Sequence, residues 1–180
     1  MIKRIADLLQ DLLSIFRPES TYSASITALA SAASATDIFE INGADSKVVT
    51  VKRLQISGIA TAAGAFSLVL LRRDTANSVG TSTAPTAVPH DCADGVAVAN
   101  LKAYTANPTV GRLIGNLQVI RGTVTTAAGA ITNNSYTFNL DQRGSKGVVL
   151  RGFAQTLAIN LAATTITGGS FDIDVTWTER

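Results

Sequence analysis

Residues 171–178 read FDIDVTWT, and this stretch decides the fold class. Apolar and polar side chains alternate along it without a break. Because successive side chains of a strand point to opposite faces, the pattern predicts a strand with one buried and one exposed face. A helix would spread the same apolar side chains around its circumference. We therefore expect four buried residues on this strand: Phe171, Ile173, Val175 and Trp177.

Period-two runs recur upstream, from residue 36 onward, and no helical period persists there for three turns. In the run 66–71 both faces are apolar, which is typical of a buried central strand. Further strands are expected at 38–41, 48–56, 96–101, 136–140, 148–151 and 157–161, and residues 112–126 are long enough for one bent strand or two. Eight or nine strands without crossover helices predict an antiparallel sandwich. The strand number and the long loops favour a jelly roll over an immunoglobulin-like fold.

The first 17 residues, MIKRIADLLQDLLSIFR, have a different character. Apolar side chains recur there at alternating spacings of three and four, which predicts an amphipathic α-helix that ends before Pro18. Asp7, Gln10 and Asp11 interrupt the apolar run that a secretory signal needs. The apolar seam, which we expect to contact a partner, consists of Ile2, Ile5, Leu9, Leu12 and Phe16.

Two placements of this helix are open: packing on its own β domain, or contact with another chain. Residues 18–35, rich in Ser, Thr and Ala, resemble an extended arm between the helix and the body. The expected organisation is a helical anchor at 1–17, an arm at 18–35 and a β-sandwich body at 36–180. The expected fold class is thus all-β, an antiparallel jelly-roll-like β-sandwich with an N-terminal amphipathic α-helix.

The composition favours contacts between protein subunits over binding to a membrane or to nucleic acid. The 180 residues are 46% hydrophobic and 16% charged, against roughly 25% charged in average soluble domains. Apolar surface in excess is expected at subunit contacts, so we predict a homo-oligomer. No apolar run reaches the roughly 18 residues of a membrane span. A net charge of +2 with scattered Lys and Arg does not predict nucleic-acid binding.

Reactive side chains cluster only once, at His90, Asp91, Cys92 and Asp94. A nucleophilic cysteine needs a base held in place and a third group that orients the base. This Pro-containing loop provides neither, and no further His or Cys completes a zinc site. We expect a solvated or interface loop.

Two carboxylates and two aromatic rings are the other candidates. Asp172 and Asp174 share one strand face about 7 Å apart, a spacing that could suit sugar hydrolysis or an oxygen-rich cation site. Trp177 and Tyr136 could stack on a sugar, yet each lies in the apolar register of its strand. The better interpretations are that the two carboxylates lie on a charged outer face and that the two rings lie in the core. We therefore predict no catalytic residue, cofactor or metal.

Several separated segments resemble a family. They are ATDIFEINGAD (35–45), LLRRDTANSVGTSTAPTAVP (70–89), AYTANP (103–108), VLRGFAQTLAIN (149–160) and GGSFDIDVTWTE (168–179). Together they resemble small virion-associated structural proteins of tailed bacteriophages and prophages. The resemblance covers nearly all of 35–179 and omits the N-terminal helix. It implies a role as a capsid cement or decoration protein, a head-fibre base or a tail-associated component, often as a β-sandwich trimer.

The expected function is therefore a non-enzymatic capsid cement or decoration protein that binds the particle and stabilises it as a homo-oligomer, with a trimer favoured. Expected partners are copies of the chain and other virion proteins, such as the major capsid or portal and neck proteins. The expected location is the virion, assembled in the host cytoplasm. The alternative is a tail-fibre or head-fibre module that binds host surface glycans, which exposed aromatic side chains at a loop tip would favour.

Overall fold

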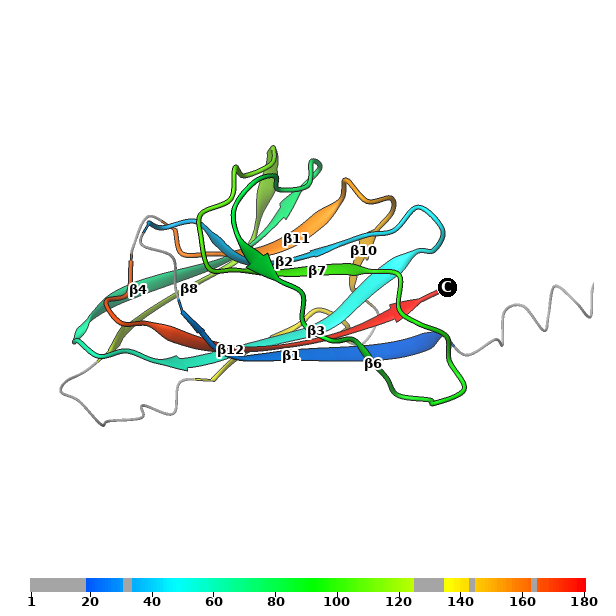
Figure 1. Cartoon of the computed structure of the whole chain (residues 1–180), viewed down its shortest axis with the longest axis horizontal. Helices are drawn as coiled ribbons and strands as arrows, with labels where there is room; N and C mark the ends of the chain where they lie inside the picture. The colour runs from blue at the N-terminus through cyan, green and yellow to red at the C-terminus, as the bar shows by residue number, and fades with distance from the viewer. Residues whose placement is uncertain (1–18, 31–33, 125–134, 143–144, 163–164) are drawn as a thin grey trace, which may run out of the picture.

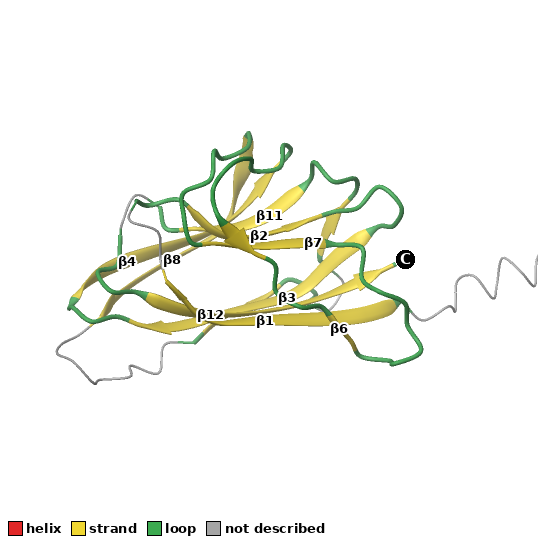
Figure 2. Ribbon diagram, viewed as in Figure 1, coloured by secondary structure: helices red, strands yellow, loops and turns green. Residues whose placement is uncertain are grey.

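The computed structural model describes residues 19–30, 34–124, 135–142, 145–162 and 165–180. They form two antiparallel sheets that face each other, with loops at both ends (Figures 1 and 2). The strands are β1 (Ser20–Ala30), β2 (Asp37–Asn42), β3 (Val49–Ile59), β4 (Gly64–Arg73), β5 (Ser82–Thr83), β6 (Val88–Pro89), β7 (Asn100–Tyr104), β8 (Leu113–Val124), β9 (Tyr136–Asn139), β10 (Val148–Leu150), β11 (Thr156–Asn160) and β12 (Ser170–Glu179).

The first sheet has the order β10-β3-β12-β1-β6, with β9 also paired to β3. The second sheet has the order β5-β7-β2-β11-β4-β8. Apolar side chains from the inner faces of both sheets form one core cluster. The predicted all-β sandwich is confirmed at this level. No helix lies among the described residues, and none there is long and apolar enough to cross a bilayer.

The predicted register of the last strand is confirmed. Along β12 the four expected side chains are buried, and Trp177 has an exposed fraction of 0%. Asp172 and Asp174 are exposed on the other face. The central position of β4 is confirmed as well, because it lies between β11 and β8 and buries Leu70 and Leu71, on opposite faces.

The prediction of an arm at 18–35 is wrong over most of its length. Residues 20–30 form β1, which pairs with β12 from Ser20 opposite Glu179 to Ala30 opposite Ser170. A bulge between Ile26 and Leu29, with Ala28 at φ 55°, breaks the period of two that identifies a strand. Small Ser, Thr and Ala side chains hide the pattern further, although Tyr22, Ala24 and Leu29 fill the core.

Two other expectations need adjustment. The strand expected at 96–101 is displaced to β7 (Asn100–Tyr104). Of the residues 112–126, for which one bent strand or two was expected, the described ones form one strand, β8, along β4. The predicted helix 1–17 and its seam, Ile2, Ile5, Leu9, Leu12 and Phe16, lie outside the described residues, so both stay predictions.

Candidate functional site

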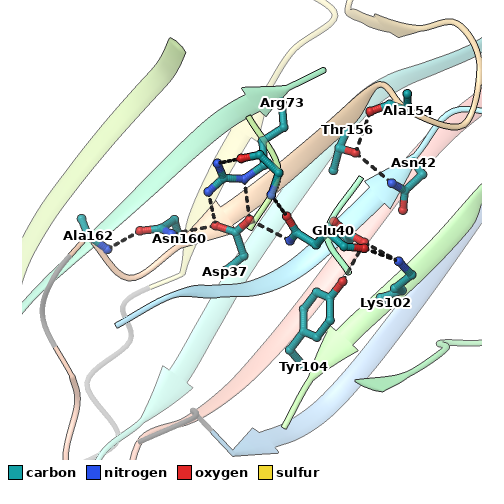
Figure 3. A network of polar contacts seen from close by, with 12 residues as sticks. Asp37, Glu40, Asn42, Arg73, Lys102, Tyr104, Ala154, Thr156, Asn160 and Ala162 are labelled. Carbon is teal, nitrogen blue, oxygen red and sulfur yellow. Dashed lines mark hydrogen bonds and ion pairs between the residues drawn. The ribbon is translucent and has the colours of Figure 1, made fainter. Parts of the chain in front are cut away.

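The connection between β4 and β8, residues 74–112, is tied to the outer face of the second sheet by a buried ion pair (Figure 3). Arg73 donates from Nε and Nη2 to the two carboxylate oxygens of Asp37, at 2.7 and 2.9 Å. Asn77 and Asn160 donate to the same carboxylate at 2.8 and 2.6 Å. Four donors thus compensate a carboxylate with an exposed fraction of 0%, which is what a buried charge requires.

The same contacts hold the two ends of this connection together. Asn77 accepts a hydrogen bond from the Gly111 amide at 2.8 Å, and the Gly111 carbonyl accepts one from Arg73 at 2.7 Å. A Cβ at position 111 would lie 1.7 Å from the carbonyl oxygen of Thr75, so only glycine permits this approach. The ion pair is therefore a structural closure of a long loop.

A second buried carboxylate lies nearby on β2. Glu40 accepts hydrogen bonds at Oε1 from Lys102 at 2.8 Å and from Tyr104 at 2.7 Å. Burial and the adjacent Glu40 carboxylate raise the pKa of Tyr104 above its ordinary range. Oε1 is thus occupied by donors from β7, while Oε2 is enclosed without a protein partner. Glu40 has an exposed fraction of 0%, and its hydrogen bonds join β2 to β7.

The other half of the same connection closes the edge of the first sheet. β6 pairs with Tyr22 and Ser23 of β1, and Figure 1 shows it beside that strand. Beyond β6, the His90 amide donates to the Thr21 carbonyl at 2.8 Å, and Ser20 donates to Asp94 at 2.8 Å. The Tyr22 hydroxyl donates to the Gly95 carbonyl at 2.9 Å.

Glu179 completes this closure from the end of β12. Its buried carboxylate accepts hydrogen bonds from the backbone amides of Val98 and Ala99, each at 2.9 Å, and from the Trp177 indole at 3.0 Å. Lys47 lies 3.5 Å away. The Trp177 ring stacks on Tyr22, with 5.7 Å between ring centroids. The aromatic pair and one carboxylate thus fasten residues 95–99 to the sandwich.

The members of the predicted reactive cluster have different hydrogen-bond partners. His90 Nε2 lies 2.7 Å from Ser23 Oγ, and Cys92 is exposed with a free thiol. Asp91 accepts a hydrogen bond from the Ala93 amide, and Asp94 accepts one from Ser20. Neither carboxylate orients the imidazole. The polar side chains of this cluster instead form hydrogen bonds within the loop and from the loop to β1.

The two carboxylates of β12 likewise bond to β1. Asp174 accepts a hydrogen bond from Ser25 at 2.5 Å, and Asp172 accepts one from the Ala28 amide at 2.8 Å. Asp172 thereby satisfies the backbone at the β1 bulge. Among the described residues no group of three or more His, Cys, Asp or Glu is placed to hold a metal ion.

Aromatic side chains lie mainly inside. Trp177 is buried, as its register predicted, and the half-buried Tyr136 packs edge-on against Phe66 at 5.9 Å. Phe153 is the one aromatic residue in the described part of the chain with a largely exposed side chain, at 45%. Lys102 Nζ lies 5.9 Å from its ring centroid. A single ring beside a lysine is not an aromatic platform for sugars.

The surface feature that remains is β8, the last strand of the second sheet. Ten large apolar side chains are exposed among the described residues, and five of them lie within residues 110–119. We call these five the β8 patch: Val110, Leu113, Ile114, Leu117 and Val119. Exposed apolar groups concentrated in this way are typical of a contact with another molecule. Sequence reasoning identified the strand but not its position at an edge, which depends on the order of all six strands.

Comparisons with known proteins give no relative. No protein-family model, no curated protein and no solved structure matches the chain.

Proposed function

We propose that this chain is a structural protein of a tailed-phage virion, most specifically a capsid cement or decoration protein that binds the particle as a homo-oligomer. The observation that carries the proposal is the β8 patch on an open sheet edge, because such a surface is suited to assembly. The low charge content and the resemblance of residues 35–179 to small virion proteins support the same function. The resemblance adds the virion as the location.

The fold that we propose within this role is a jelly roll. Consecutive strands alternate between the sheets, with β1 and β3 in the first and β2 and β4 in the second. Toward the C-terminus β8 and β11 belong to the second sheet, and β9 and β12 to the first. The resulting orders β1-β12-β3-β9 and β2-β11-β4-β8 are those of two nested Greek keys. This architecture is common in capsid domains.

We propose further that the role is not catalytic. Three buried carboxylates, those of Asp37, Glu40 and Glu179, accept hydrogen bonds from donors on neighbouring strands and loops. The carboxylates that sequence analysis considered bond to β1 or to their own loop; they are those of Asp91, Asp94, Asp172 and Asp174. Catalysis would need a nucleophile or an acid–base pair directed into an accessible site. The glycan-binding alternative has less support, because the aromatic side chains in the described part of the chain are buried apart from Phe153 and the half-buried Tyr136.

The test is attachment of the chain to particles. Tagged full-length chain is supplied during assembly of the encoding phage, and the copies that co-purify with intact particles are counted. We expect copies on the scale of the major shell protein. A few copies per particle would indicate a neck or tail component, and absence from washed particles would overturn the proposal.

The predicted anchor is tested in the same assay. The change Leu9→Asp with Leu12→Asp places charges on the apolar seam and is expected to lower attachment, since unpaired charges disfavour an apolar contact. The matched control, Gln10→Asp with Ser14→Asp, adds the same charge to the polar side and should attach as the parent does. Equal attachment of both variants would assign the anchoring to another part of the chain.

A further inference from the structure

β8 presents an unsatisfied backbone edge as well as apolar side chains. Its twelve residues, Leu113–Val124, pair on one side with β4, and no described strand pairs with the other side. The amide and carbonyl groups on an open edge are ready to pair with another strand. Natural sheets commonly protect such an edge with charges, proline or a covering loop. β8 has no proline and a single charged residue, Arg121.

Two irregularities in β8 display apolar residues. Ten residues of β4 lie opposite the twelve of β8, with register shifts between Leu70 and Leu71 and between Arg72 and Arg73. The two residues of β8 without an opposite partner on β4 are therefore Leu117 and Ile114. Their exposed fractions are 47% and 58%. Bulges normally twist an edge away from pairing, yet here the extra residues enlarge the apolar surface.

We propose that β8 pairs antiparallel with β8 of a second copy, so that the second sheets of two copies become one continuous sheet. This inference rests on the proposed function in one respect, since it names the partner of the same assembly surface. An antiparallel pair of identical strands is self-complementary about a two-fold axis, and two-fold contacts are the commonest among homo-oligomers.

Charge and register favour a second copy as the occupant. A two-fold axis near Gln118 places Leu117 opposite Val119 of the other strand. Arg121 then lies opposite Gly115, so the one charge of each strand meets no like charge across the pair. The pairing buries apolar residues against apolar residues and satisfies two backbone edges together. It predicts a dimer or a higher even-numbered oligomer, whereas the resemblance implied a trimer.

The test measures the mass of the full chain in solution by light scattering over a range of concentrations. We expect a dimer or an even-numbered oligomer for the parent, and loss of the two-fold contact in the double variant Leu117→Lys with Val119→Lys. The matched control is Val88→Lys with Val96→Lys, because these exposed apolar residues lie in β6 and in the segment that follows it along the edge of the first sheet. Circular dichroism confirms that each variant keeps its strands.

A charge-swap experiment identifies what pairs with the β8 edge. The Lys variant is mixed with Leu117→Glu and Val119→Glu in the same chain. Each variant alone should lose the contact, and the mixture should regain the even-numbered mass because Lys on one β8 then meets Glu on the other. Only direct pairing of two β8 strands gives this rescue. A mixture that stays dissociated assigns the edge to a different segment or protein and overturns the proposal.

Other outcomes separate this inference from the proposed function. A monomeric parent, or a trimer that the β8 changes leave intact, overturns the pairing and leaves attachment to particles untouched. A rescued dimer that never attaches to particles supports the pairing and overturns the virion role. A mass that falls when the seam residues Leu9 and Leu12 become Asp, but not when β8 is changed, assigns assembly to the N-terminal segment and overturns the pairing.

Discussion

The two sheets end in very different edges. At one end of the first sheet, the short β6 and residues 90–99 of the β4–β8 connection lie against β1. Tyr22 and Ser20 donate hydrogen bonds to this connection, and Glu179 accepts hydrogen bonds from its backbone amides. The second sheet ends at β8, where no described strand follows and the apolar β8 patch is exposed. Both sheets pack against the same core, so the need to bury that core does not by itself explain why one edge is covered and the other is not.

The comparison shows where the chain places its polar groups. Buried carboxylates and their donors hold the long connection against one edge and one outer face, because loop backbone near a core must find hydrogen-bond partners. The other edge has almost no charge and no covering segment among the described residues. One edge is closed within the chain, and the other has the composition of a surface that is closed between chains.

The largest effect is expected from breaking the buried ion pair that holds the connection in place. Asp37→Asn keeps the shape but leaves Arg73 as an uncompensated buried charge. We expect a loss of about 3–5 kcal/mol in the free energy of unfolding, measured by denaturant titration. The covered edge would loosen with it, which faster exchange of the His90 amide, bonded to the Thr21 carbonyl, would report.

The residue after Arg73 belongs to an exposed ion pair that serves as a control for this change. Asp74 accepts hydrogen bonds from Arg112 at the surface, and this contact lowers the pKa of Asp74. Asp74→Asn makes the same chemical change in an exposed pair, where solvent screens the charges. We expect no resolvable loss of stability. Equal effects at positions 37 and 74 would contradict the assignment of Asp37 as a buried closure.

A smaller loss is expected from Glu179→Gln. The amide retains one acceptor oxygen for three donors, and it loses the charge that strengthens those hydrogen bonds and attracts Lys47. A loss of about 1.5–3 kcal/mol follows from the values typical of hydrogen bonds to a charged group. Denaturant titration measures it, and protection of the Val98 and Ala99 amides should fall. Unchanged protection would show that residues 95–99 are held by other contacts.

The pH dependence of stability provides a more limited test on the second sheet. The pKa of Tyr104 is raised in the folded protein, by burial first and by Glu40 second. Below the ordinary tyrosine pKa of about 10, Tyr104 keeps its hydroxyl proton in both the folded and the unfolded state. The stabilisation that this protonated hydroxyl contributes to the fold is then present in full. Above it the unfolded state loses its proton while the folded state does not, so stability falls as pH rises.

Tyr104→Phe isolates this group from the other tyrosines. The variant should be less stable than the parent at pH 8, and the gap should narrow between pH 10 and 11. Unfolding midpoints at each pH measure the gap. A gap that stays constant over this range would mean that Tyr104 ionises as readily when folded.

The features that sequence reveals are those encoded within one strand. FDIDVTWT places its apolar residues at every second position, so β12 and its buried face follow from residues 171–178 alone. β1 escapes the same reasoning because its side chains are small and its bulge shifts the period. The Asp37–Arg73 pair joins residues 36 positions apart, and nothing local in either segment signals the contact.

The position of β8 is hidden for a related reason. Apolar residues on both sides of the run 113–120 resemble those of a buried central strand, such as 66–71 in β4. The pattern is the same whether the second neighbour is a strand of the same chain or of another copy. Strand order, which depends on the whole topology, decides between the two.

The smallest effect on stability is expected from changes at Ser23 and His90, the pair at the covered edge of the first sheet that most resembles part of an active site. Ser23 and His90 lie within hydrogen-bond distance, which is the first requirement for an activated nucleophile. The second requirement is a group that orients the imidazole, and the nearby carboxylates of Asp91 and Asp94 bond elsewhere. His90 is exposed, so His90→Ala should leave stability within about 0.5 kcal/mol of the parent. Ser23 is half-buried and also contacts Thr176, so Ser23→Ala should cost about 1 kcal/mol, as is typical of one hydrogen bond. Hydrolysis of an activated ester should proceed at the same rate in parent and variants, without a burst that depends on Ser23. A Ser23-dependent burst would give the covered edge a chemical role, and the contrast between a closed edge and an assembling edge would then have to be drawn differently.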